Sequence, residues 1–373
     1  LWFMQQLLKL TVLFILLSGC NTYKTKYPYS LDDFRPELRK HLEKIVENGG
    51  TCIEYFEETE DGPDAKIYSY LSNHTSISDL QKLIKCEHPL LRAYSFSILC
   101  SKDDFNIDNT LLSNLDDTST ITYCRGEWGE NFILVSDYYI YKSKGHTTIP
   151  EEVFKNKIIE NHRYLKNAYT FISNLDTPEL KYYRIIKEMA YKENPADKKV
   201  NSLYALSKYK RSEDIPFIAE EISHYWRSQN SHPLFEIIEE NPDTTYFKIL
   251  EKFYKSISYG KTREERQLNF YLSTAKLHVK YESFLKALVA YKSIRSSRII
   301  ADILDKEIYP LESIAGINYR YTIYQLLFDK KCKEYSDLIT LLKPEATEIE
   351  KKIIRAGSNL DSMAIDIPSN GYW

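Results

Sequence analysis

Apolar residues recur at helical spacing in the part of the chain that follows Ser76. Intervals of three and four residues place such side chains on one face of a helix. Pro89 opens the second of two successive patterns, where its missing N–H costs no hydrogen bond in the first turn of a helix. The pattern predicts helices over about 77–84 and 89–99 that form a hairpin. The apolar positions are Ile77, Leu80, Leu83 and Ile84 in the first helix, and Leu91, Tyr94 and Ile98 in the second.

A helix is also expected earlier, from about Arg35 to Val46, where Leu38, Leu42 and Ile45 share one face. Gly49 and Gly50 stop it. The chain of 373 residues contains only 11 Gly and 13 Pro, which favours long helices over a fold with many turns. An all-α fold is therefore predicted.

One short stretch occurs twice. "ALSKYKR" (205–211) and "ALVAYKS" (287–293) share Ala-Leu and Tyr-Lys at an offset of 82 residues, or about two units of 41. A second apolar stripe follows each copy, near 215–222 and near 299–304, and Asp214 with Pro216 predicts the start of a helix at the first. Between the copies, 232–257 contains two more apolar stripes separated by the turn Asn241-Pro242-Asp243. The spacing predicts repeating units of two helices.

These stretches resemble HEAT repeats. "HPLLRAYSFSIL" (88–99) and "ALSKYKRSEDIPFI" (205–218) each combine an apolar helix with a turn that contains Pro or Asp, and Arg92 supplies the basic residue near the start of a helix. The helix at 215–222 lacks that basic residue. The resemblance covers about 76–304 and implies an α-solenoid that acts as a binding or scaffolding module. A helical bundle without repeats is the alternative.

The segment 119–150 fits the helical scheme less well. It contains β-branched and aromatic residues and two glycines around Trp128, which favours a β-ribbon or a long loop inserted between helical units. Insertions in solenoids often gather on the binding face. Trp128, Tyr138 and Tyr139 are therefore candidate partner-binding residues, and Trp226 is a fourth. A compositional bias toward codons rich in A and T is the alternative explanation for the 31 tyrosines.

The first twenty residues carry a targeting pattern. An apolar run of roughly eight residues, from Leu10 to Leu17, matches the core of a signal peptide and is far shorter than the about 20 residues that a spanning helix needs. Leu17-Ser18-Gly19-Cys20 resembles the lipobox of bacterial lipoproteins. The resemblance implies that residues 1–19 are removed and that Cys20 is lipidated, with 20–30 as a tether. An ordinary secretory signal is the alternative.

The resemblance also implies a cellular location. Asn21, in place of Asp, favours the outer membrane of a bacterial envelope over the inner membrane. The helical-repeat domain is expected over 31–356, and the tail 357–373, which lacks a helical period, is expected to be extended or disordered. No partner is identified by the sequence.

The net charge, the absence of catalytic motifs and the cysteine spacing exclude several classes of function and site. A formal net charge of −3 with mixed signs gives no electrostatic footprint for nucleic acid. Neither HExxH, GxSxG, GxGxxG nor paired CxxC occurs, so neither a catalytic site nor a metal or cofactor is predicted. Cys86 and Cys100 flank a helix of roughly 16 Å, too long for a disulfide, whereas a Cys100 to Cys124 bridge stays open.

We therefore expect a lipid-anchored envelope protein that binds a protein or glycan partner through stacked helices. An (α/α) toroid that acts on polysaccharides is the first alternative, and it requires two carboxylates roughly 5 to 10 Å apart. A structural assembly subunit without a ligand of its own is the second.

Overall fold

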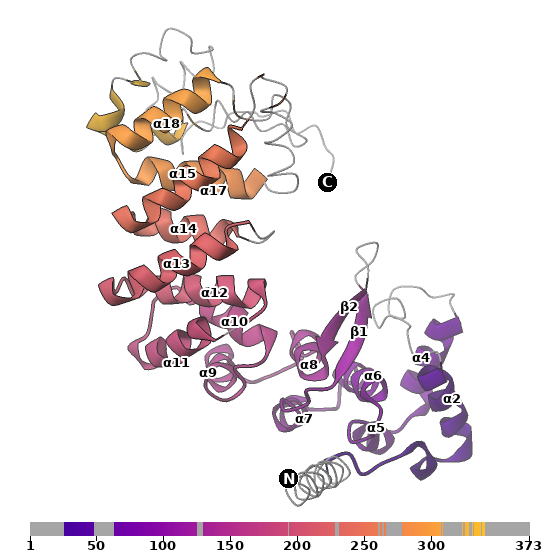
Figure 1. The fold of residues 1–373 in the computed structure, drawn as a ribbon. Coiled ribbons are helices and arrows are strands. Elements are labelled where there is room, and N and C mark those ends of the chain that lie inside the picture. Colours follow the sequence, from indigo (N-terminus) through magenta and orange to yellow (C-terminus); the bar gives the residue numbers. More distant parts are fainter. Residues whose placement is uncertain are drawn as a thin grey trace, which may run out of the picture. The chain divides into compact units, whose positions relative to one another are not determined.

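The computed structural model describes residues 26–47, 63–124, 130–192, 194–227, 231–259 and 278–306, and shorter pieces between 262 and 339. Within these ranges the chain is all-α, apart from one antiparallel hairpin (Figure 1). The chain divides into two compact units, 1–168 and 169–373. No helix in the described ranges has the length and apolar content to cross a membrane.

Helix α6 forms the centre of the first unit. Ten consecutive residues of α6, from Leu91 to Cys100, are buried, because α2, α4, α5, α8 and the hairpin all pack on it. A helix that is covered on all sides needs apolar or fully satisfied side chains around its whole circumference. The helices of this part are α2 (Pro36–Glu47), α4 (Pro63–His74), α5 (Ile77–Leu83), α6 (Pro89–Cys100) and α7 (Asp108–Ser113).

The predicted hairpin of helices is confirmed as α5 and α6. Ser76 caps α5, because its hydroxyl accepts a hydrogen bond from the Asp79 amide at 3.1 Å while Asp79 accepts one from the Ser76 amide. Pro89 stands in the first turn of α6, as its missing N–H allows. The helix expected from Arg35 to Val46 is likewise confirmed as α2.

The segment 119–150 is only partly the ribbon or loop that its composition suggested. Strands β1 (Thr120–Cys124) and β2 (Glu130–Leu134) form the hairpin, with Ile121 opposite Ile133 and Thr122 opposite Phe132. The next eight residues form helix α8 (Val135–Lys142), which packs on α6. Helix α9 (Glu151–Asn161) follows. The segment therefore contributes to the core of the first unit.

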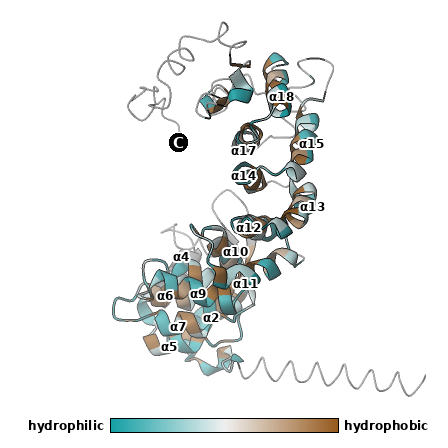
Figure 2. Cartoon of the chain, turned by 90° about the vertical axis from the view of Figure 1, so that its left-hand side faces the viewer, coloured by the Kyte–Doolittle hydropathy of each residue, from teal (hydrophilic) through white to brown (hydrophobic). Residues whose placement is uncertain are grey.

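Helix α10 (Lys166–Ser173) leads into the second unit, whose described helices are paired in two rows (Figure 2). One row, which we call the inner row, contains α12 (Ala196–Ser207), α14 (His232–Glu240) and α17 (His278–Ala290). In it α12 packs on α14, and α14 packs on α17. The outer row contains α11 (Leu180–Tyr191), α13 (Ile215–Tyr225), α15 (Phe247–Ile257) and α18 (Ile294–Asp305). Each outer helix is the chain neighbour of an inner helix.

The two copies of the repeated stretch occupy equivalent places in these rows. The first copy ends α12 and the second ends α17, and both are followed by a turn into an outer helix. Lys210 and Lys292, 82 residues apart, are the described non-glycine residues with positive φ, at 52° and 47°. The inner helices end at Ser207, Glu240 and Ala290, so successive ends are 33 and 50 residues apart rather than a uniform 41.

Tyrosine hydroxyls connect these units. Tyr209 donates to the Glu179 carbonyl at 2.7 Å, and Tyr291, its equivalent in the second copy, donates to the Asp243 carbonyl at 2.5 Å. Tyr281 donates to the Ile308 carbonyl at 2.7 Å. Tyr281 is buried and the other two are half-buried, and in each case a backbone carbonyl of another segment satisfies the hydroxyl. These tyrosines therefore have a structural role.

Candidate functional site

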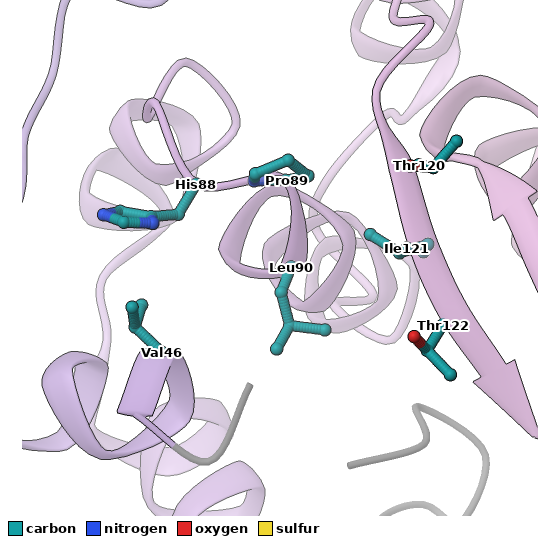
Figure 3. A pocket seen from close by; sticks show the side chains of 7 residues that line it. All are labelled: Val46, His88, Pro89, Leu90, Thr120, Ile121 and Thr122. Carbon is teal, nitrogen blue, oxygen red and sulfur yellow. The ribbon is translucent and has the colours of Figure 1, made fainter. Parts of the chain in front are cut away.

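A groove lies between helix α2, the start of α6 and strand β1 in the first unit (Figure 3). Its cavity has a volume of about 240 Å³. Four of the lining residues are apolar, while a histidine and two threonines add polar groups. The lining residues are Val46 from α2; His88, Pro89 and Leu90 at the start of α6; and Thr120, Ile121 and Thr122 from β1.

The entry of the chain into α6 shapes one wall of this groove. His88 precedes the helix in extended conformation, and Pro89 fixes the backbone of the first turn. The His88 side chain is about one-third exposed, and its Nε2 lies 3.6 Å from the Glu87 carboxylate. Pro89 and Leu90 are half-buried. The wall is thus apolar with a polar rim.

Arg92 anchors this wall to the strand opposite. Its side chain is fully buried, and its guanidinium donates to both carboxylate oxygens of Asp117, at 2.7 and 3.1 Å. It also donates to the carbonyls of Cys86 and Glu87, at 2.7 and 2.9 Å, and to the Ser119 hydroxyl at 2.7 Å. Since Ser119 directly precedes β1, one side chain holds the α5–α6 turn and the start of the strand together.

The charge on Arg92 is well compensated. Burial disfavours the charged form, but the hydrogen bonds and the charge of Asp117 outweigh it, so the pKa of Arg92 lies above its usual value. The guanidinium also lies 3.8 Å from the centre of the Tyr27 ring. The basic residue noted in the sequence near the start of a helix is therefore a buried structural group, and it is not available to a ligand.

Cys86 is buried too deeply to act as a nucleophile. The thiol is free and fully buried, and burial raises its pKa above the usual value. As expected, Cys86 is not bridged to Cys100. Within the described ranges, nowhere do three His, Cys, Asp or Glu side chains gather closely enough to hold a metal ion.

Tyr138 and Tyr139 were predicted to face a partner, and this prediction is wrong. Both are fully buried in α8, and the Tyr139 ring stacks on Phe96 of α6 with 4.1 Å between ring centres. Strand alternation would have exposed one of the two, whereas in the helix both lie toward the core and Tyr141 is the exposed tyrosine.

Trp226, the predicted binding residue in the second unit, is also buried, with 7% of its surface exposed. Its ring packs edge-on against Phe253 at 5.7 Å, so it belongs to the core between rows. Trp128, the lipidation residue Cys20 and the tail 357–373 lie outside the described residues.

Sequence reasoning did not find the groove. Pro89 was predicted to open a helix, but Val46 and Thr122 are far from it in the chain and carry no pattern that links them. Comparisons with protein-family models, with curated proteins and with solved structures find no match for this chain. The groove offers an apolar surface and strand backbone, which suits binding better than bond-breaking chemistry.

Proposed function

We propose that this protein is a helical-repeat binding module of a bacterial envelope, anchored by lipid at Cys20, that holds a protein partner. The observation that carries the proposal is the equivalence of the two turns at Lys210 and Lys292, which end corresponding inner helices. Sequence and backbone thus repeat together in the second unit.

The arrangement of helices supports an α-solenoid as the form of this module. Outer helices pack on inner helices and on each other: α11 and α13 contact α12, α15 and α18 contact α17, and α13 contacts α15. In repeat proteins such stacking buries one face of each pair and leaves extended surfaces for partners. The same rows would also serve a scaffold without catalytic function.

The inner row supplies the surface that we assign to the partner. One stripe of each inner helix is half-exposed and combines polar, charged and aromatic groups. The Tyr204 hydroxyl donates to Glu240 at 3.4 Å, and Lys286 pairs with Glu282 at 2.7 Å. The stripes contain Asp197, Asn201, Tyr204 and Lys208 on α12; His232, Glu236 and Glu239 on α14; and Glu282 and Lys286 on α17.

Photo-crosslinking in intact cells tests the proposal. Benzoylphenylalanine replaces Asn201, Glu236 or Lys286, one at a time, on the inner row. Arg298, exposed on the outer helix α18, is the control position. We expect the same protein to be captured from all three inner positions and not from Arg298. Crosslinks to glycan alone, or equal capture from Arg298, would contradict the proposal.

The anchor is tested separately by Cys20→Ser. The resemblance of Leu17-Ser18-Gly19-Cys20 to a lipobox supports lipidation, and two or more acyl chains give stable membrane attachment. We expect the wild-type chain in the membrane fraction with a mass increase from the lipid, and the variant without it. An unmodified wild-type Cys20 in a membrane-free fraction would contradict the anchor but leave the repeat surface untouched.

A further inference from the structure

We infer that the groove beside β1 is a site for β-strand addition, in which an extended segment of a partner protein becomes the third strand of the hairpin sheet. This inference rests on the proposed function, because it names a second contact surface for a protein partner. The surface belongs to the first unit and is independent of the inner helical row.

The outer edge of β1 presents the backbone groups that such a strand needs. The Val135 amide donates to the Ser119 carbonyl at 2.8 Å, which makes Ser119 and Val135 a hydrogen-bonded pair. In antiparallel strands, hydrogen-bonded pairs alternate along the ladder. Ile121 therefore bonds to Ile133 in β2, while the N–H and C=O groups of Thr120 and Thr122 point to the opposite edge. Within the described residues they have no hydrogen-bond partner.

The floor beside this edge is a helix surface that the sheet leaves uncovered. Ile121 is buried on the face of β1 that packs toward α6. Beyond it, the half-buried side chains of Pro89, Leu90 and Val46 border the cavity of about 240 Å³ (Figure 3). A third strand would extend the sheet over these side chains.

The chemistry of the ligand follows from the backbone groups at the edge of β1 and from the apolar floor beside it. Strand addition takes its affinity from main-chain hydrogen bonds and its specificity from pockets for alternate side chains. The two outward backbone pairs of Thr120 and Thr122 require extended backbone, and the apolar floor requires one apolar side chain directed toward α6. The ligand is therefore a short extended peptide segment with an apolar residue flanked by residues whose side chains point away from the floor.

Peptide selection followed by amide exchange tests the site. The probe is a twelve-residue peptide selected from a phage-displayed random library against residues 20–373, and NMR measures exchange at single amides. We expect the Thr120 and Thr122 amides to slow at least tenfold when the peptide binds. The Ile121 amide, already bonded to β2, should change by less than twofold.

Two variants assign the binding to the groove. Leu90→Arg places a charge on the half-buried floor, and Val153→Arg makes the same kind of change at a site on α9 that is 56% exposed. We expect Leu90→Arg to weaken peptide binding at least tenfold and Val153→Arg to change it by less than twofold. Circular dichroism of both variants verifies that the helices remain.

Several results would overturn strand addition. The first three are a library without binders, binders that Leu90→Arg does not weaken, and uniform slowing of exchange along β1. The fourth is slowing that grows with protein concentration in the absence of peptide, because this result would assign the edge to a second copy of the chain. If strand addition fails while inner-row crosslinks persist, the repeat function stands. Loss of the inner-row crosslinks together with persistence of the peptide would remove the proposed function and leave the groove.

Discussion

Replacement of Arg92 by Met should destabilise the first unit strongly. The change removes the five hydrogen bonds of the guanidinium and leaves the Asp117 carboxylate, whose side chain is 2% exposed, with the Ser119 amide as its nearest donor at 3.1 Å. The carbonyls of Cys86 and Glu87 also lose the hydrogen bonds that they accept from Arg92. Removal of one partner of a buried ion pair typically costs about 3–5 kcal/mol.

The loss of stability arises mainly from the uncompensated charge of Asp117, and a second substitution separates this contribution from the loss of the ion pair itself. Asp117→Asn in the Arg92→Met background removes the isolated negative charge. We expect the double variant to recover about 1–3 kcal/mol relative to Arg92→Met alone, because an uncharged amide is cheaper to bury than a carboxylate without its partner.

Native-state hydrogen exchange of the α6 amides measures these free energies. This readout is preferred to a single melting curve, because a chain of two units need not unfold in one step. Exchange of the buried residues from Leu91 to Cys100 reports the opening of the first unit. A loss below about 1 kcal/mol for Arg92→Met would refute the reasoning, since it would mean that Asp117 reaches water or another partner easily.

Four further predictions concern single side chains. Tyr139→Phe should leave stability unchanged or raise it by about 1 kcal/mol in a thermal melt, because the buried hydroxyl has no hydrogen-bond partner within the described part of the chain; a clear loss would contradict this. Lys280 is buried near the rings of Trp226 and Phe253, and burial lowers its pKa from 10.5 to about 8. Since the unfolded chain then binds more protons between pH 8 and 10.5, stability should rise with pH in that window, and Lys280→Met should flatten the rise in urea titrations. Burial, with Lys44, Lys40 and His74 nearby, lowers the pKa of His41, so stability should fall as the pH drops from 6.5 through the depressed pKa, and a His41→Gln variant should show a smaller fall. Lys210→Gly and Lys292→Gly should each raise the melting temperature, because glycine adopts positive φ without the cost of about 1 kcal/mol that a side chain incurs, whereas Lys208→Gly in the same region should lower it.

The helices could be predicted from the sequence because their apolar spacing is local. The stripes at 38–46, 77–84 and 215–222 each supply the buried residues of a helix, although Ile77 at the start of the second is exposed. Asp214 was expected to start the last of these, and it does precede α13, but its carboxylate accepts from Lys187 and Tyr183 instead of capping the helix. The position of the boundary was thus correct and the role of the side chain was not.

Helix α8 was not predicted from the sequence because its residues have strand propensity. Tyr138, Tyr139 and Ile140 are typical of strands, and propensity is a weak guide when tertiary burial decides the outcome. Here α6 supplies an apolar surface on one side, and Asp137 accepts hydrogen bonds from the Lys166 and Asn167 amides at 3.0 and 3.2 Å. Such long-range contacts leave no trace in the local pattern.

The binding residues were predicted poorly for a related reason. Trp226, Tyr138 and Tyr139 are large and aromatic, which suits an interface and a core equally well. Residue type alone does not distinguish the two environments. The groove residues Val46, Leu90 and Thr122 are unremarkable singly and gain meaning only from the fold that brings them together.

The central claim, that the inner helical row holds a protein partner, is tested most directly by affinity. Tyr204→Ala changes a half-exposed aromatic residue on α12, and Arg298→Ala changes an exposed residue on the outer helix α18. Calorimetric titration with the purified, crosslink-identified partner should give binding at least tenfold weaker for Tyr204→Ala and unchanged within twofold for Arg298→Ala. Equal affinities for the wild type and both variants would contradict the claim.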